Sequence, residues 1–532
     1  MAKYAGTTPK TSRSALKTTD EETLTHEGAR AYAKDARTEL FTLAVTSMTG
    51  EDTFYESAAD RDSRLRSLVR QLAAEDPAFI QQLVPWLRNT ANMRSAPIVI
   101  AAEYAIANGE NRRYVIDSAM VRADEPAEFI GYYMQVTGRK TMPAGIQRGV
   151  ADAVQRIYNE WNALKYDSGY HDLRMGDVIE LTHPQSTDER QGELYEWLLD
   201  KRHNPTNVRA NLAKLPVIQA RANIEAVEPA QRREVLRGVA DLSPLAAPEA
   251  VLAAKEAFAI AGITWEYLSG WLPGGMDAEA WEFVLPHMGY MAILRNLRNF
   301  DEAGISDEAR AYVKEVVEKP ENVAASRQFP YRFWSAWKAT GSVEWGPSLE
   351  KALKLSCQNI PEFEGTTIVF VDVSGSMEQA VSEKSQVRNC DVAALFGAAV
   401  FEKNPKNTRV VIYGTYSKDV TPGQRGSVLR HIDNFRGNHG LGHATYLSRA
   451  VDAEYRSEDR VVVFTDEQSH DGGASGRAKF THYFDLAGYR ATPDKVGVGG
   501  TFMYGGFVDA TFRQMKLNEL TRTSDWDAIL TE

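Results

Sequence analysis

Five side chains with oxygen donors are spaced so that they could together hold a divalent cation: Asp372, Ser374, Ser376, Thr445 and Asp466. In the run Asp-Val-Ser-Gly-Ser-Met, which starts at residue 372, alternate positions of a tight loop place the two serine hydroxyls on one side. Carboxylate and hydroxyl oxygens without a thiolate suit Mg²⁺ or Mn²⁺. Such an ion would keep an open position for a carboxylate or phosphate of a partner. We therefore predict a magnesium-type metal site on these residues.

The alternative for each of these residues, taken singly, is a helix cap, because serine and aspartate after a strand often cap the next helix. The complete set, in this order and on these elements, favours the metal site. Nothing in the sequence favours catalysis. It contains no Gly-x-x-x-x-Gly-Lys phosphate loop, no nucleophile elbow and no His-Glu-x-x-His motif, and Ser374 has no evident base partner. We predict that the protein is not an enzyme.

The elements around these residues predict a doubly wound parallel sheet. Short, apolar, β-branched runs at 367–372, 409–413 and 461–466 have the composition of strands that are buried on both faces. Helical patterns at 391–402 and 446–455 separate them. Such sheets bind ligands at the carboxyl ends of their strands, and two of these runs end in aspartate.

The longer, amino-terminal part of the chain has a helical pattern almost throughout. Apolar residues recur at helical spacing, as at Ile146, Val150, Val154 and Ile157, and no strand-like alternation interrupts the stretch. Proline and glycine divide it into helices of ~10–20 residues. Stacked helix pairs in a solenoid would bury the apolar faces of so long a region, and a compact all-α domain is the alternative.

These patterns divide the 532 residues into a flexible tail at 1–20, a helical region at 21–355 and an α/β domain at 356–532, an α + α/β fold class. The net charge is −11, so any nucleic-acid site must be a local basic patch. Cys357 and Cys390 lack zinc-ligand spacing and fit a reducing compartment. Because there is no secretory signal and no apolar run of ~18 residues, we expect a cytoplasmic protein without a membrane span.

The set Asp372-x-Ser374-x-Ser376, followed by Thr445 and Asp466, resembles the metal-ion-dependent adhesion site (MIDAS) of von Willebrand A domains. In that family the serines and the threonine bind the ion directly, and the aspartates usually act through water. The family binds proteins and is not typically catalytic. The resemblance therefore implies a von Willebrand A-like domain with an Mg²⁺ or Mn²⁺ cofactor.

Five further passages resemble the Ro autoantigen family, in which a helical TROVE module precedes an A domain: Asn92–Pro97, Gly176–Pro184, Met291–Arg298, His482–Tyr489 and Gly506–Phe512. In scattered patches the resemblance extends over roughly residues 21–520. It implies a bacterial or phage-type Ro orthologue, in which HEAT-like helix pairs of the TROVE module form a ring that the A domain closes.

The same resemblance implies a small ribonucleoprotein. Its protein would bind structured non-coding RNAs, called Y RNAs, on the outer ring surface, and would capture misfolded RNA or single-stranded 3′ ends through the central hole. This implies RNA quality control or processing, in bacteria beside an exoribonuclease. We expect a monomer with no DNA or membrane partner. The competing hypothesis is a metal-dependent protein-binding adaptor whose helices serve only as a scaffold.

Ten residues are predicted RNA contacts, all of them basic or imidazole side chains: Arg94, Arg112, Arg113, Arg139, Lys140, Lys165, Arg174, His183, Arg295 and Arg298. His183 matches a position that contacts RNA in the Ro family, and the alternative is a histidine satisfied within its loop. Helical spacing puts Arg295 and Arg298 on one face.

Each of these cations also has a structural interpretation. The arginines could form ion pairs within the helical region, and the pairs Arg112-Arg113 and Arg139-Lys140 could simply be solvated. Glu180 stands where the Ro family usually carries a basic residue before His183. This departure from the family pattern bears on the strength of RNA binding on that face and not on its existence.

Overall fold

The structure is a computed structural model that describes the chain except at 1–14, 47–49, 170–171, 241–257, 259, 327, 329, 358–359, 361, 384, 424–425, 507–509, 522–525 and 531–532. The chain folds into two compact units. The first, which we call the sheet unit, comprises residues 1–110, 329–335 and 353–532. The second, the helical unit, comprises residues 111–328 and 336–352.

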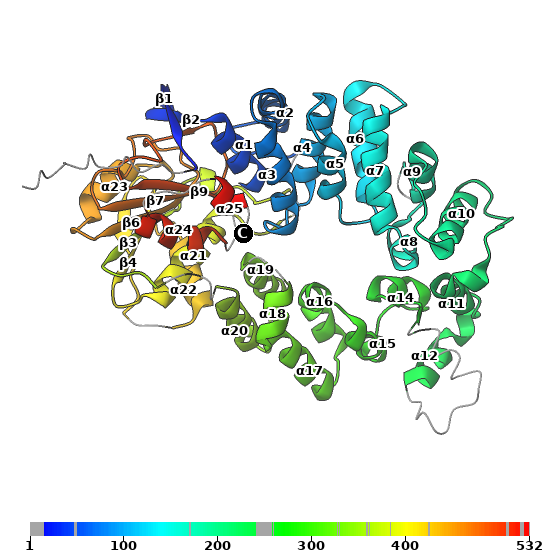
Figure 1. The fold of residues 1–532 in the computed structure, drawn as a ribbon. Coiled ribbons are helices and arrows are strands. Elements are labelled where there is room, and N and C mark those ends of the chain that lie inside the picture. Colours follow the sequence, from blue (N-terminus) through cyan, green and yellow to red (C-terminus); the bar gives the residue numbers. More distant parts are fainter. Residues whose placement is uncertain are drawn as a thin grey trace, which may run out of the picture. The chain divides into compact units, whose positions relative to one another are not determined.

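The described residues of the sheet unit form a six-stranded sheet of order β5-β4-β3-β6-β7-β9 (Figure 1). The strands are β3 (Thr367–Asp372), β4 (Thr408–Tyr413), β5 (Ser417–Asp419), β6 (Arg460–Thr465), β7 (Phe480–Asp485) and β9 (Thr501–Gly505). All pairs are parallel except β4 with β5. Every residue of β3 and β6 is buried, as expected for central strands that are covered on both faces.

Five helices accompany these strands in the described carboxy-terminal part of the chain: α21 (Asn389–Lys403), α22 (Val428–Arg436), α23 (Leu447–Glu454), α24 (Ala510–Thr521) and α25 (Trp526–Leu530). Helix α21 is buried from Asn389 to Phe401, because it packs on β3, β4 and β6 and also against α22. The ring of Phe396 on α21 lies 5.2 Å from the ring of Phe512 on α24. The doubly wound α/β fold that the sequence predicts is confirmed.

Two strands precede the first helix, where the sequence pattern predicted helix from about residue 21. Strands β1 (Thr18–Leu24) and β2 (Arg30–Lys34) form an antiparallel hairpin, and β2 also pairs with β8 (Ala491–Thr492). Ala31 and Ala33 are buried at the alternate positions expected of a strand. This alternating run covers only a few residues, so it does not stand out in the sequence. The expectation of helix here was wrong, and residues 18–20 of the expected tail belong to a strand.

A buried ion triad fixes this hairpin to the sheet. The ammonium of Lys34 lies 2.6 Å from a carboxylate oxygen of Asp485 and 2.9 Å from one of Glu467, and all three side chains are fully buried. Lys34 Nζ also donates to the carbonyl of Tyr489 at 2.8 Å. Buried charges persist only when they are paired and hydrogen-bonded. The hairpin is therefore an integral part of the sheet unit.

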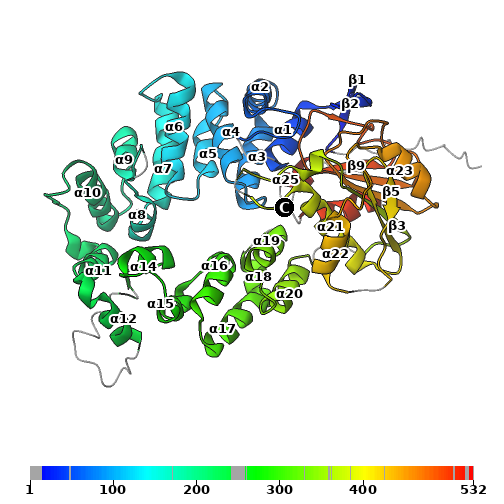
Figure 2. The same ribbon diagram turned by 180° about the vertical axis from the view of Figure 1, so that it is seen from behind.

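Four helices belong to the described amino-terminal part of the sheet unit: α1 (Ala36–Thr46), α2 (Ala58–Glu75), α3 (Pro77–Asn89) and α4 (Ser95–Ile106). They pack on one another, and α1 also contacts β9 while α3 contacts α25. Figure 2 shows the same elements from behind. The compact units therefore do not divide at residue 355, and the boundaries of a TROVE region at 21–355 and an A domain at 356–532 stay a prediction.

The helical unit consists, in its described part, of short helices that follow one another with brief connections: α5 (Arg112–Ala119), α6 (Glu125–Thr137), α7 (Ala144–Ile157), α8 (Glu160–Tyr166), α9 (Met175–Thr182), α10 (Glu189–His203), α11 (Pro216–Glu225), α12 (Arg232–Ala240), α14 (Trp265–Trp271), α15 (Ala278–Val284), α16 (Tyr290–Ala303), α17 (Asp307–Glu318) and α18 (Pro320–Ser326). Helices α19 (Tyr331–Thr340) and α20 (Gly346–Ser356) are each shared between the two units.

Contacts in the helical unit run in sequence order, from α5 to α7, from α7 to α9 and from α9 to α10, as in a helical-repeat stack. On α7 the apolar stripe predicted from the sequence, Ile146, Val150, Val154 and Ile157, is buried. Among the described helices of the whole chain, none is long and apolar enough to cross a membrane.

Candidate metal centre and candidate RNA contacts

The end of strand β3 holds Asp372 in a fixed orientation. Its Oδ2 accepts hydrogen bonds from the Thr465 hydroxyl at 2.7 Å and from the Tyr413 hydroxyl at 3.2 Å. Its Oδ1 accepts the backbone N–H of Ser374 at 2.9 Å. Because the hydroxyl donors come from the two strands that flank β3, the sheet itself positions this carboxylate at the carboxyl end of the strands.

The hydroxyl residues come from two loops that touch at this edge. The Ser374 and Ser376 hydroxyl oxygens lie 3.3 Å apart, and both side chains are buried. Between them, the N–H of Gly375 donates to the carbonyl of His443 at 2.9 Å, which joins the serine loop to the loop that carries Thr445. The structure therefore brings the three predicted hydroxyl ligands to one edge of the sheet.

The second aspartate, Asp466, has an unsatisfied oxygen. It follows β6 directly, and its Oδ1 accepts the N–H of Gln468 at 3.1 Å. Its Oδ2 is buried and has no hydrogen-bond partner among the described residues. Burial raises the pKa of Asp466 to about 7, and repulsion from the Asp372 carboxylate acts in the same direction. Burial also raises the pKa of Asp372.

The edge offers two buried carboxylates and three hydroxyls, and one of the carboxylate oxygens, Asp466 Oδ2, has no hydrogen-bond partner among the described residues. A hard divalent cation would satisfy this donor set. The cation would place positive charge where the two carboxylates repel one another. The residues present therefore fit an Mg²⁺ or Mn²⁺ ion, with Ser374, Ser376 and Thr445 as direct ligands and the two aspartates behind them. When bound, the ion would supply an electrophilic position for an oxygen of a partner.

Aromatic and acidic residues near this edge come from the amino-terminal segments, and no sequence pattern predicted them. The ring of Tyr55 stacks on that of His26 at 5.0 Å and meets the ring of Tyr489 at 5.5 Å. Glu27 accepts a hydrogen bond from the Tyr55 hydroxyl and lies 2.9 Å from His470 Nε2. More than 300 residues separate the amino-terminal segments from the metal motif, so no local spacing could have revealed them.

The predicted RNA contacts lie on several different elements, in both units. His183 is exposed and ends α9 with a left-handed backbone, at φ 48°. Arg94 belongs to the sheet unit, and the other nine belong to the helical unit. Arg295 and Arg298 are both exposed on α16, and this shared exposure agrees with the prediction that they lie on one helix face.

Several of these cations are already paired with carboxylates. Arg113 lies 2.6 Å from Asp152, Arg174 forms an ion pair with the buried Asp167, and Arg298 lies 3.4 Å from Glu302. These pairs directly support the structural interpretation of the three arginines. The pairs of Arg113 and Arg298 are exposed, and an exposed pair can exchange its carboxylate for a phosphate because both ions are in contact with water.

The remaining cations differ in their surroundings. Arg139 and Lys140 are exposed after α6, and the Lys165 ammonium lies 5.3 Å from the centre of the Tyr166 ring. Arg94 is exposed and Arg112 is half-buried. The structure therefore leaves most of these cations accessible to a ligand without showing which of them act together.

Glu180, which departs from the family pattern, is paired in the structure. Its carboxylate lies 3.3 Å from His203 Nε2, and the nearby Asp177 accepts a hydrogen bond from Arg202 at 2.8 Å. Oxygen and nitrogen atoms of Asp177, Glu180 and His203 lie within 4.8 Å of one another. Because Arg202 already supplies the positive charge, we do not assign a metal to this group.

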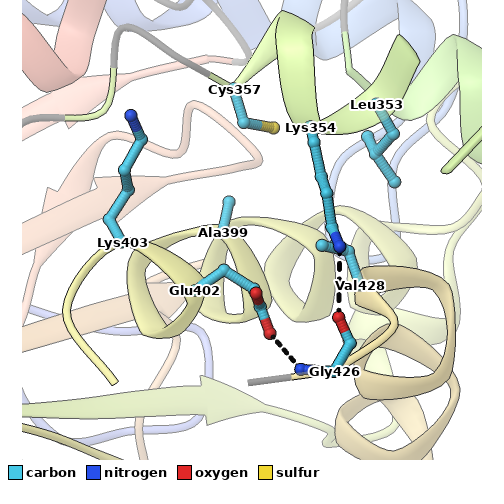
Figure 3. Close-up of a pocket in the computed structure, with 8 residues that line it drawn as sticks. All are labelled: Leu353, Lys354, Cys357, Ala399, Glu402, Lys403, Gly426 and Val428. Carbon is cyan, nitrogen blue, oxygen red and sulfur yellow. Dashed lines mark hydrogen bonds between the residues drawn. The ribbon is translucent and has the colours of Figure 1, made fainter. Parts of the chain in front are cut away.

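A pocket of about 430 Å³ lies elsewhere in the sheet unit and has eight lining residues: Leu353, Lys354, Cys357, Ala399, Glu402, Lys403, Gly426 and Val428 (Figure 3). Its volume is in the range of small-molecule sites. Lys354 donates to the carbonyl of Gly426 at 3.2 Å, and Glu402 accepts the Gly426 N–H at 3.0 Å. None of the metal or RNA residues predicted from the sequence lines this pocket.

Comparison with known proteins bears on both units. Residues 263–401 match the family model described as the TROVE domain. Among solved structures, the crystal structure of the Ro (RSR) protein of Deinococcus radiodurans is similar, with 17% sequence identity and a TM-score of 0.59. The similarity covers 90% of this chain and 100% of the Deinococcus chain. No curated protein matches the sequence. The partial TROVE match and the shared fold confirm the resemblance to the Ro family that the sequence predicts.

Proposed function

We propose that this protein is a non-catalytic RNA-binding protein of the Ro type. It would bind small structured, Y-like non-coding RNA and misfolded or 3′-tailed RNA in the cytoplasm, for RNA quality control or processing. The observation that carries this proposal is the TROVE match at 263–401 together with a Ro-like fold over 90% of the chain. Cleavage of the bound RNA would be the task of a partner exoribonuclease.

The exposed cations of the helical unit are the proposed contacts to phosphate. Arg139, Lys140 and Arg295 are exposed, and none of them has an ion pair within the described part of the chain. We assign His183, which is also exposed, to an unpaired base, since imidazole can stack on a base or form a hydrogen bond with it. Phosphate contacts give affinity without sequence preference.

The experiment that tests this proposal compares two RNAs, a hairpin with a single-stranded 3′ tail and the same hairpin trimmed blunt. Filter binding at two salt concentrations should show tighter binding of the tailed RNA, insensitive to the sequence of the tail. Duplex grooves of A-form RNA are hard for side chains to read, so single-stranded ends are the accessible signal. Binding of neither RNA would overturn the RNA-binding proposal. Equal binding of both would leave only a site for structured RNA.

A second proposed function, compatible with the first, is metal-dependent binding of a protein partner by the A-type domain. The orphaned Oδ2 of Asp466 favours it, because a buried carboxylate oxygen without a donor is costly unless a cation is near. Calorimetry with Mn²⁺ should give one site in the parent protein and none in the double variant Asp372→Ala, Ser374→Ala. Unchanged one-site binding in the double variant would overturn the assignment. RNA binding should survive this change.

A further inference from the structure

The loop of residues 50–57 lies against the edge of the sheet that carries the predicted metal ligands. The carboxylate of Glu51 accepts the N–H of Glu383 at 2.9 Å, and the carbonyl of Asp52 accepts the side-chain amide of Gln379 at 3.4 Å. Gln379 and Glu383 belong to the segment that follows Ser376. One side of the loop is therefore attached to the serine loop of the metal motif.

The other side of the loop is anchored to the body of the sheet unit. Glu56 lies 3.1 Å from Arg61 and 2.7 Å from Arg64, and all three side chains are largely buried. Arg61 in turn donates to the carbonyl of Ala487 at 2.9 Å. With both sides held, the residue between them, Tyr55, has a defined position.

That position is beside the metal edge, by which we mean the edge of the sheet that carries the five predicted ligands. Burial raises the pKa of Tyr55 far above its usual value, and the Glu27 hydrogen bond and the charge of Asp466 act in the same direction. The Tyr55 hydroxyl therefore lies close enough to Asp466, one of the predicted ligands, to be affected by its charge. The N–H of Tyr55 donates to the Tyr489 hydroxyl at 3.3 Å, and the two rings lie 5.5 Å apart.

Glu27 and His470 hold the Tyr55 hydroxyl in place. One oxygen of Glu27 accepts the Tyr55 hydroxyl, and the other lies 2.9 Å from His470 Nε2. His470 Nδ1 lies 3.2 Å from the backbone nitrogen of Thr445, so it can accept that N–H while Nε2 carries the proton toward Glu27. The chain of contacts thus runs from Tyr55 through Glu27 and His470 to another predicted ligand.

We propose that the loop of residues 50–57 is a lid on the metal edge, with Tyr55 as its cover and Glu27 with His470 as its latch. A carboxylate of a protein partner would reach the edge only after Tyr55 has moved away. The role of the lid rests on the proposed metal-dependent partner binding, but its presence does not. The loop and its latch therefore act as an autoinhibitory contact that the chain makes with its own A-type domain.

The test is the chemical accessibility of the edge. Ser376 is 4% exposed, and the two native cysteines are buried, at 6% and 1%. In the variant Ser376→Cys, kept in chelator, modification by a thiol reagent should be slow. Adding Tyr55→Ala should speed it about tenfold or more, because this change removes both the covering ring and the hydrogen bond to the charged Glu27. Glu27→Gln should give a smaller increase, because it weakens the latch and leaves the ring.

A matched control is Tyr416→Ala, which removes a 65% exposed tyrosine of the same unit and should leave the rate unchanged. Tyr55→Phe keeps the ring and loses only the hydroxyl, so its increase should match that of Glu27→Gln. Circular dichroism checks that each protein is folded. Equal modification rates with Tyr55 present and absent would overturn the lid. This readout needs no metal, so it is separate from the Mn²⁺ test of the proposed function.

Discussion

The metal edge of the sheet unit and the cations of the helical unit were both predicted from residue type and spacing, but the structure treats them differently. The five predicted oxygen ligands are buried at one edge, where strand ends and two loops meet. The predicted RNA cations are mostly exposed on separate elements, and several are paired with acids. A parallel sheet directs all its strand ends to one edge, whereas successive helices present their side chains in many directions.

The buried triad of Lys34, Glu467 and Asp485 should give the largest effect, because its charges are removed from water and depend on one another. Lys34→Ala leaves two buried carboxylates without a cation, which is expected to cost about 3–5 kcal/mol of unfolding free energy. Urea denaturation of the parent and the variant measures this loss. A loss of this size would sharpen the comparison between the two units, because removal of an exposed cation of the helical unit should not lower the unfolding free energy by a similar amount.

The matched control for Lys34 lies on the same strand. Arg30 is exposed and pairs with the exposed Glu22, so Arg30→Ala should change the urea midpoint little. Similar losses in the two variants would contradict the special role of the buried triad. A small loss in Lys34→Ala would show that the hairpin is not held to the sheet as the structure has it.

The pH dependence of stability should be the next largest effect, through the buried pair Asp372 and Asp466. The folded pKa of Asp466 is about 7, above its ordinary value of 3.8. The folded protein therefore binds this proton more tightly than the unfolded chain does. The resulting gain in unfolding free energy is fully present below the unfolded pKa and is lost as the pH rises toward the folded pKa of about 7. Relative to Asp466→Asn, which does not titrate, the metal-free parent should lose on the order of 2 kcal/mol between about pH 5 and 8.

Saturating Mn²⁺ should remove this pH dependence from the parent, because the ion favours the charged carboxylates in the folded state. Denaturation midpoints of both proteins, with chelator and with Mn²⁺, measure the difference. In chelator, the parent should lose stability relative to Asp466→Asn as the pH rises. If the parent instead gained stability, Asp372 and Asp466 could not be a buried pair of carboxylates without a compensating cation. An identical pH profile with and without Mn²⁺ would count against the metal site.

The parts of the fold that could be predicted from the sequence are those with a long apolar or alternating run of residues. The runs at 367–372 and 461–466 are long, β-branched and flanked by helices, and their strands end within one residue of the prediction. The β1–β2 hairpin was missed, because its alternation covers few residues and β1 is largely exposed. Its stability depends on Lys34 meeting acids more than 430 residues away, which local reasoning cannot see.

The candidate site shows the same limit. Ligands on one motif and on strand ends could be placed from spacing alone, because the sheet fixes where they project. Tyr55, Glu27 and His470 could not, because three separate segments bring them together. Residues 507–509 of the last passage that resembles the Ro family, and residues 1–14 of the expected tail, lie outside the described residues. The resemblance on Met291–Arg298 falls within α16 and within the TROVE match.

The smallest expected effect separates two exposed arginines of α16, Arg295 and Arg298, of which Arg298 lies 3.4 Å from Glu302. If RNA binds here, Arg295→Ala should lower the slope of log affinity against log salt by ~1, as for one lost phosphate contact. Arg298→Ala should lower it less, because Glu302 already neutralises part of its charge, and Glu302→Ala should strengthen binding. Equal slope changes in the two arginine variants would show that the ion pair does not compete with RNA. Unchanged slopes in both would remove α16 from the proposed RNA surface.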